Sequence, residues 1–130
     1  MNILIINNNK LIVAILANLI RKCADPKHIY KSYSISCAKK WLKGYNVNIV
    51  FLDASIESSL DGIDLFKEIK SNNAQLPVVV MTSKNNSGVI SKVLDISAGD
   101  YLVQPLSIKK IHHCLFNIKN KPYSLSGESV

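Results

Sequence analysis

The chain lacks the long apolar runs of a membrane protein and the clustered cysteines of a metal or disulfide protein. None of its apolar runs approaches the roughly 20 residues needed to cross a bilayer. The first apolar stretch spans only Ile3 to Ile6 and follows no basic patch, so we expect no signal peptide. The cysteines, Cys23, Cys37 and Cys114, are odd in number, far apart and without metal-ligand spacing. They predict buried thiols in a reducing compartment, and we expect the protein to be cytoplasmic.

Acidic residues are scarce in the first half of the chain, and the formal net charge is +7. Residues 1–52 contain eight Lys or Arg and one acid, Asp25, whereas residues 53–100 contain seven acids and four lysines. A basic excess is compatible with nucleic acid or an acidic partner. However, Arg21 is the only arginine, the lysines are scattered, and no aromatics interleave with them in a stacking pattern. We interpret the lysines as a solvated surface and expect neither direct nucleic-acid binding nor membrane contact.

What the chain does contain is a regular alternation of apolar runs and stretches with helical spacing. Strands are expected at Ile3–Ile6, roughly at His28–Tyr33, at Asn48–Leu52, in PVVVMTS from Pro77, and at Tyr101–Val103. Helices are expected to bury Ile12, Ile15, Leu16 and Leu19; Ala38, Trp41 and Leu42; Ile63, Phe66 and Ile69; Val89, Ile90, Val93 and Leu94; and Ile108, Ile111, Leu115 and Ile118. An asparagine before the first helix, and Ser34 or Ser36 before the second, are typical N-caps.

Five strands that alternate with five helices, the clearest strands being apolar throughout, indicate a parallel sheet covered on both faces. Right-handed crossovers then give a doubly wound three-layer α/β/α sandwich. We expect one domain over residues 1–120, with residues 121–130 as a flexible tail or the start of a linker. Ligands of such sheets bind at the carboxyl ends of the strands, where Asn7, Asn8, Asp53, Thr82, Ser83 and Gln104 are expected.

Three segments carry a specific resemblance: FLDASIESSLDG, VVVMTS and AGDYLVQP. In this order they resemble the signatures of the receiver domain of bacterial two-component response regulators, over roughly residues 2–120. The resemblance implies a flavodoxin-like sheet with strand order 2-1-3-4-5. It also implies a signalling module that takes a phosphoryl group from a histidine kinase onto one aspartate.

The resemblance assigns roles to residues at the carboxyl edge. Asp53 matches the phosphoacceptor, and Thr82 matches the hydroxyl that hydrogen-bonds the phosphoryl group. Tyr101 matches the aromatic that turns inward when this hydroxyl moves, so Thr82 and Tyr101 would form the switch. Ser83 matches a position that favours a small side chain. From the residues alone, three of these positions have a simpler explanation. Asp53 would be an aspartate that caps a turn, Thr82 an ordinary threonine at a strand end, and Tyr101 a half-buried core tyrosine.

Three features depart from the family pattern. Asn7 and Asn8 stand where the family has two acids that hold Mg²⁺, and Gln104 replaces the lysine before the proline. The loop from Asp53 to Gly62, in which the carbonyl of Ser55 would reach the metal, is one residue longer than expected and lacks the usual proline. We expect Mg²⁺ to bind this site weakly or not at all. Whether the peptide bond before Pro105 is cis, as in the family, stays open at this point.

Two functions follow from these residues. The first is an atypical receiver that acts as a protein-interaction switch, with Mg²⁺-dependent phosphorylation of Asp53 weakened or absent. The alternative is a conventional receiver that a histidine kinase phosphorylates on Asp53, regulating an attached or partner output domain. Either would work with a histidine kinase or phosphotransfer protein and with an output domain, for instance a DNA-binding one. A homodimer through the fourth helix, last strand and fifth helix is a further expectation, and no enzymatic activity beyond self-phosphorylation is expected.

The composition also argues against two enzymatic functions that the fold permits. A flavin site would need a loop rich in Gly, Ser and Thr after the first strand, and NNNKLIV has none of these. Hydrolase chemistry is not expected, because His28, His112 and His113 are predicted to lie away from the carboxyl edge.

Overall fold

The computed structural model describes residues 1–57, 61–82, 88 and 101–120. These residues form a five-stranded parallel sheet with strand order β2-β1-β3-β4-β5. The strands are β1 (Asn2–Ile6), β2 (His28–Ser32), β3 (Ile49–Asp53), β4 (Val78–Thr82) and β5 (Tyr101–Val103). The helices are α1 (Lys10–Cys23), α2 (Ile35–Gly44), α3 (Asp61–Asn72) and α5 (Ile108–Lys119). The predicted strand order is therefore confirmed, while the helix expected at Val89–Leu94 lies outside the described residues.

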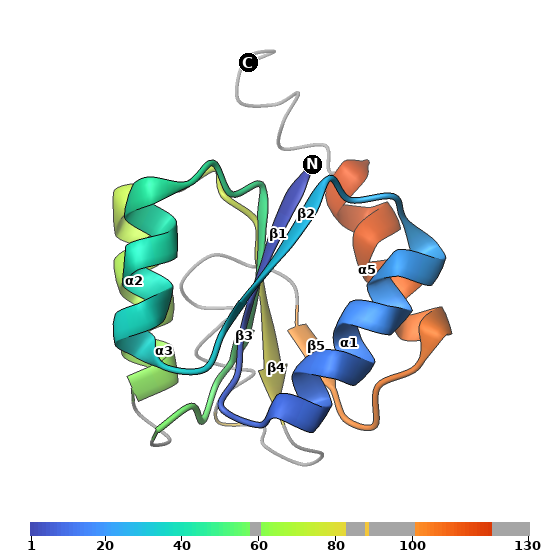
Figure 1. The fold of residues 1–130 in the computed structure, drawn as a ribbon, viewed down its shortest axis with the longest axis horizontal. Helices are drawn as coiled ribbons and strands as arrows, with labels where there is room; N and C mark the ends of the chain where they lie inside the picture. The colour runs from blue at the N-terminus through green and yellow to red at the C-terminus, as the bar shows by residue number, and fades with distance from the viewer. Residues whose placement is uncertain (58–60, 83–87, 89–100, 121–130) are drawn as a thin grey trace.

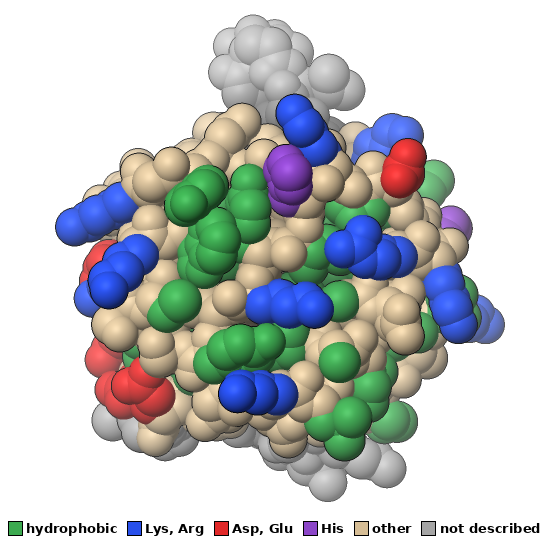
Figure 2. Space-filling view, in the orientation of Figure 1, with side chains coloured by type: hydrophobic (Ala, Val, Ile, Leu, Met, Phe, Trp, Pro, Cys, Tyr) green, Lys and Arg blue, Asp and Glu red, His purple; other side chains and the backbone are tan. Residues whose placement is uncertain are grey.

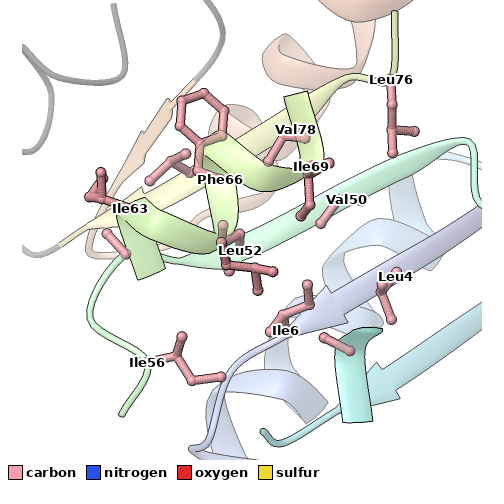
Figure 3. Packing of buried hydrophobic residues seen from close by; sticks show 14 residues of the cluster. Leu4, Ile6, Val50, Leu52, Ile56, Ile63, Phe66, Ile69, Leu76 and Val78 are labelled. Carbon is pink, nitrogen blue, oxygen red and sulfur yellow. The ribbon is translucent and has the colours of Figure 1, made fainter. Parts of the chain in front are cut away.

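The sheet separates two layers of helices, with α2 and α3 over one face and α1 and α5 over the other (Figure 1). Side chains alternate along each strand, so each face has its own core. On the α2–α3 side, Ile63, Phe66 and Ile69 of α3 pack against the sheet residues Val50 and Leu52 (Figure 3). The inward face predicted for this helix is confirmed. The central strands β1, β3 and β4 are buried almost throughout, as a parallel sheet covered on both faces requires.

Side-chain caps begin three of the helices. The side chain of Asn9 accepts hydrogen bonds from the backbone N–H groups of Leu11 and Ile12 at 3.0 and 3.2 Å, which caps α1. Ser34, and not Ser36, caps α2 by accepting from the N–H of Cys37 at 3.2 Å. Ser107 does the same at the start of α5. Each cap satisfies backbone donors that the first helical turn leaves without a partner.

The buried face of α1 differs from the prediction. Val13, Leu16, Ala17 and Ile20 are buried, whereas Ile15 is 41% exposed. The sequence of α1 is apolar on nearly every side, so helical spacing alone did not select the face that packs on the sheet. In α5 the prediction was also partly wrong, because Ile108 is 47% exposed and Cys114 is buried beside Ile111.

The cysteines are free thiols, as expected, but only Cys114 is buried. Cys23 and Cys37 are half-buried. Burial nevertheless raises the pKa of the Cys23 thiol. Its sulfur lies 3.5 Å from the carbonyl oxygen of Ile108, a contact that joins the end of α1 to the start of α5.

Gly62 in the first turn of α3 is required by a close approach of two backbone segments. A Cβ at this position would lie 2.0 Å from the carbonyl oxygen of Ala54 and 2.7 Å from that of Asp53. Because both neighbours are backbone atoms, neither can rotate away. Any larger residue would therefore push the start of α3 away from the end of β3, where Asp53 is located.

We predict that Gly62→Ala lowers the free energy of unfolding by about 1–3 kcal/mol, the usual cost of forcing extra atoms into a packed site. The matched control is Gly44→Ala at the end of α2, where an added Cβ meets nothing within 4 Å. Alanine there is expected to stabilise the fold by up to about 1 kcal/mol, since it removes helical glycine. Urea denaturation of both variants tests this pair, and equal stability of the two would contradict the close-approach argument.

Candidate functional site at the carboxyl edge

The strand ends bring the predicted site residues to one edge of the sheet. Ile6 pairs with Leu52 and Asp53 pairs with Met81, so Asn7 follows β1 beside the end of β3. Thr82 pairs with Val103, so Gln104 lies next to the end of β4. A backbone hydrogen bond of 3.0 Å from the N–H of Gln104 to the carbonyl of Thr82 extends this pairing.

The alternation of side chains divides these residues between the two faces of the sheet. Asn7, Asp53 and Gln104 continue the alternation of Ile5, Phe51 and Leu102, which belong to the α1–α5 core. Thr82 continues the alternation of the α2–α3 core and is only 3% exposed. Asp53 is half-buried at the end of its strand. The structure thus places one carboxylate and two amides on one side of the edge and the threonine on the other.

The three asparagines after β1 build the turn into α1. The Asn7 side chain is 3% exposed, and its Oδ1 accepts a hydrogen bond of 2.8 Å from the backbone N–H of Asn9. Asn9 then caps α1, while Asn8 is exposed. The simple explanation, a polar turn after a strand, therefore accounts for Asn7 and Asn9, and the predicted cap at the first helix is confirmed.

Ser55 occupies one oxygen of the Asp53 carboxylate. The backbone N–H and the hydroxyl of Ser55 lie 3.1 and 3.2 Å from Asp53 Oδ1 and donate hydrogen bonds to it. A backbone bond of 3.2 Å from the N–H of Ile56 to the carbonyl of Asp53 closes the same turn. The carboxylate is thus held by its own loop, and only the backbone of Ser55 had been singled out from the sequence.

The lengthened loop after β3 contains a second contact that the sequence did not predict. Glu57 has a φ of 64°, a left-handed conformation that is uncommon for a residue other than glycine. Its Oε2 accepts a hydrogen bond of 2.8 Å from the backbone N–H of Ile35 at the first residue of α2. A carboxylate at a helix N-terminus is electrostatically favourable. The sequence showed that this loop has one extra residue, but it did not show that the loop reaches α2.

Lys110 of α5 is a cation that contacts the loop around Gln104. The Lys110 ammonium donates hydrogen bonds of 2.9 Å to the carbonyl oxygens of Val103 and Pro105, which flank Gln104. The peptide bond between Gln104 and Pro105 is cis. This lysine extends from α5 and stabilises the loop backbone, so it does not take the place of the lysine that Gln104 replaces.

The remaining predicted residues are placed as follows. Tyr101 begins β5 and is 40% exposed, so it is not the half-buried core tyrosine that was its simple explanation. Ser83 lies outside the described residues. His28 begins β2 at the opposite edge of the sheet, and His112 and His113 are exposed on α5, as expected.

Few groups at this edge could hold a divalent cation. The oxygen donors are the Asp53 carboxylate, the Asn7 and Asn8 amides and the backbone carbonyl of Ser55. In the part of the chain that the structure describes, no three His, Cys, Asp or Glu side chains gather closely enough to hold a metal ion. Mg²⁺ usually binds one or two carboxylates together with several waters. The donors present fit a weakly held, largely hydrated ion.

Comparison with known proteins identifies the family. The family model described as "Response regulator receiver domain" matches residues 3–116. The chain belongs to the response regulator receiver family. This receiver domain is therefore a module of two-component signalling, and such domains typically bind Mg²⁺ at an acidic pocket and are in general signalling domains rather than enzymes.

Curated relatives share this domain but are longer. The transcriptional regulatory protein CitB of Klebsiella pneumoniae is 25% identical over 112 residues, which are 86% of this chain and 47% of that protein. The two-component response regulator ARR7 of Arabidopsis thaliana is 35% identical over 72 residues, 54% of this chain and 34% of that protein. The chain therefore spans less than half the length of these relatives.

Solved structures agree on the fold. The signal receiver domain of the DNA binding response regulator MerR from Colwellia psychrerythraea 34H matches with a TM-score of 0.80 at 22% identity, covering 93% of this chain and 99% of that one. NtrX from Brucella abortus matches with a TM-score of 0.81 at 21% identity, covering 98% of this chain and 29% of that one. Within the described residues, no helix is long and apolar enough to span a membrane.

We predict that Asn9→Ala lowers the free energy of unfolding by about 1 kcal/mol, because two N–H groups of α1 lose their cap. Asn8→Ala is the matched control, since Asn8 is the exposed neighbour in the same turn, and its effect is expected to stay within about 0.5 kcal/mol. Urea denaturation of both variants measures the difference. The reverse order of effects would mean that Asn8, and not Asn9, holds the turn.

Proposed function

We propose that this receiver domain acts as a protein-interaction switch in which Mg²⁺-dependent phosphorylation of Asp53 is weakened or absent. The observation that carries the proposal is the composition of the carboxyl edge. Among the described residues at this edge, Asp53 supplies the one carboxylate donor, and amides stand at positions 7, 8 and 104. Asn7 is buried, and its Oδ1 already accepts a hydrogen bond within the turn after β1, as in a structural residue.

Charge is the physical reason for the proposal. When bound, Mg²⁺ neutralises the charge of the transferring phosphoryl group. The family site brings three carboxylates to that ion, whereas this edge supplies one. Because Mg²⁺ gives up its water reluctantly, a donor set with a single charge offsets little of the dehydration cost. Gln104 can donate a hydrogen bond to a phosphoryl group but cannot supply the charge of a lysine.

The contacts of Asp53 support the same proposal. Two hydrogen bonds from Ser55 occupy lone pairs of Oδ1, one of the two nucleophilic oxygens. Attack on phosphorus by this oxygen would require the Ser55 hydroxyl to turn away. The other carboxylate oxygen would then be the better nucleophile, and Gln104 would offer its approach a hydrogen bond but no positive charge.

A conventional phosphoacceptor is the second candidate. Asp53 and Thr82 both lie at the carboxyl edge, as that function requires.

For either candidate, we propose a histidine kinase or phosphotransfer protein and an output domain as partners, in a cytoplasmic protein. We further propose residues 1–120 as the receiver unit, followed by a tail or linker. From the family resemblance we propose that Thr82 and Tyr101 form the switch. We also propose a homodimer through the expected fourth helix, β5 and α5.

Treatment with acetyl phosphate tests the proposal directly. We predict that intact mass spectrometry shows little or no added phosphoryl group, and that adding Mg²⁺ changes this fraction by less than about twofold, since the ion is weakly held. Asp53→Ala is the control that removes the acceptor. Robust labelling that depends on both Mg²⁺ and Asp53 would overturn the proposal and establish the conventional receiver.

The combined variant Asn7→Asp, Asn8→Asp and Gln104→Lys tests the charge argument. We predict that it binds Mg²⁺ at least about tenfold more tightly by calorimetry, because two carboxylates are added beside Asp53. An aspartate at position 7 would still accept the hydrogen bond that Asn7 now accepts from Asn9, so the turn is expected to persist.

A charge-matched variant, Asn18→Asp, Asn46→Asp and Gln75→Lys, makes the same changes at exposed positions away from this edge. It is expected to leave Mg²⁺ affinity unchanged. If the edge variant gains no affinity over this control, the single charge at Asp53 is not what weakens the site, and the loop after β3 becomes the cause to examine.

A further inference from the structure

The structure gathers aromatic rings that are distant in the sequence. Tyr30 of β2 stacks on Trp41 of α2 with ring centroids 4.4 Å apart and an interplanar angle of 19°. His28 also stacks with Tyr30, with ring centroids 5.7 Å apart and an interplanar angle of 17°. Tyr45, just after α2, lies 4.4 Å from Trp41 and is 54% exposed. We call these residues the ring cluster: His28, Tyr30, Trp41 and Tyr45.

Exposed lysines lie along the same two elements. Lys27 directly precedes His28, and Lys31 follows Tyr30 on β2, where alternation sends the Lys31 side chain to the opposite face of this edge strand from Tyr30. Lys40 and Lys43 lie on either side of Trp41 in the sequence of α2. Tyr33 lies in the neighbouring turn between β2 and α2. The Lys10 ammonium lies 5.4 Å from the centre of its ring, a cation–π distance. The ion pair described on α2 uses a different lysine, Lys39, which contacts Glu68 at 3.4 Å.

Figure 2 shows this face directly, with hydrophobic side chains beside Lys and Arg across the front of the molecule and acidic side chains towards its margins. The face is centred on β2, the edge strand, which the helices leave uncovered in Figure 1. Along the sequence no aromatics interleave with the lysines, and for that reason nucleic-acid binding was not expected. In three dimensions the fold does interleave them.

The chemistry of the rings selects among anionic partners. The face of an aromatic ring carries the negative part of its quadrupole, so a carboxylate gains nothing by lying on it. A nucleobase, in contrast, stacks on such a ring whatever its sequence, while its phosphates pair with surrounding cations. The exposed rings of Tyr45 and His28 at the margins of the cluster are the ones available for stacking.

We propose that the β2–α2 face, consisting of the ring cluster and the lysines Lys27, Lys31, Lys40 and Lys43, binds single-stranded nucleic acid. Bases stack on the exposed rings and phosphates contact the lysines, without sequence-specific readout. The face belongs to β2 and α2, and none of its residues contributes to the carboxyl edge. The proposal therefore does not rest on whether Asp53 is phosphorylated.

Trp41, the only tryptophan of the chain, reports on the face by its fluorescence. The experiment titrates the 130-residue chain into a labelled oligothymidylate of about 15 nucleotides, at about 50 and about 150 mM salt. We expect saturable binding by anisotropy, weaker at the higher salt, together with a change in Trp41 fluorescence. Binding that leaves this fluorescence unchanged would overturn the proposal.

Matched variants separate the face from the overall charge. Lys31→Gln with Lys40→Gln is expected to reduce the slope of log affinity against log salt by about 1.4, at about 0.7 for each lost phosphate contact. Lys67→Gln with Lys109→Gln removes the same charge from exposed positions of α3 and α5 and is expected to keep the slope. Equal losses in the two double variants would show non-specific attraction to a basic protein and overturn the proposal.

Stacking is tested by a second matched pair. Tyr45→Ala is expected to weaken binding at least about fivefold, whereas Phe116→Ala, which removes an aromatic of similar exposure from α5, is expected to keep it. Circular dichroism and thermal unfolding of each variant confirm that the fold is intact. Poly-glutamate of matched charge is the competing probe. If it binds more tightly than the oligonucleotide and loses affinity in the same variants, the face binds acidic polypeptide instead and the proposal is wrong.

Discussion

Burial of the central strands on both faces is the constraint on which the rest of the structure depends. Strands β1, β3 and β4 have almost no exposed side chain, so they cannot carry polar chemistry along their length. Polar side chains can appear only where the strands end. The chain therefore concentrates Asn7, Asp53, Thr82 and Gln104 at one edge, and the chemistry of the domain is decided by which residues stand at those few positions. Gly62 belongs to the same constraint, because it lets α3 begin directly against the backbone of Asp53 and Ala54.

The layers and the site positions could be predicted from the sequence because each depends on local signals. The strand order was instead implied by the resemblance to receiver domains. Apolar runs marked the strands, and the residue after each run marked the edge. The buried face of α1 could not be predicted, since its residues are apolar on most sides and the sheet makes the choice. Glu57, Lys110 and the ring cluster were missed for a different reason. Each acts through a partner far away in the sequence or through a backbone atom, and neither kind of contact leaves a pattern in the chain.

The substitutions at the edge form one consistent set. A lysine at position 104 would stand beside a single carboxylate, whose Oδ1 already receives two hydrogen bonds from Ser55. With neutral amides at positions 7 and 8, little negative charge is left for such a lysine to balance. Neutral Gln104 then maintains the same low charge, and Lys110 stabilises the backbone on both sides of it. The absence of the two acids thus makes the absence of the lysine less costly to the folded domain.

Two contacts connect this edge to the β2–α2 face. The backbone N–H of Asn7 donates a hydrogen bond of 3.0 Å to the carbonyl of Ser32 at the end of β2. The carboxylate of Glu57 accepts one from the N–H of Ile35 at the start of α2. Both contacts are made by loops that also hold the site, so a ligand or partner that displaced either loop would strain the turn between β2 and α2. Glu57 makes its contact from a left-handed backbone conformation, which costs energy in a residue other than glycine.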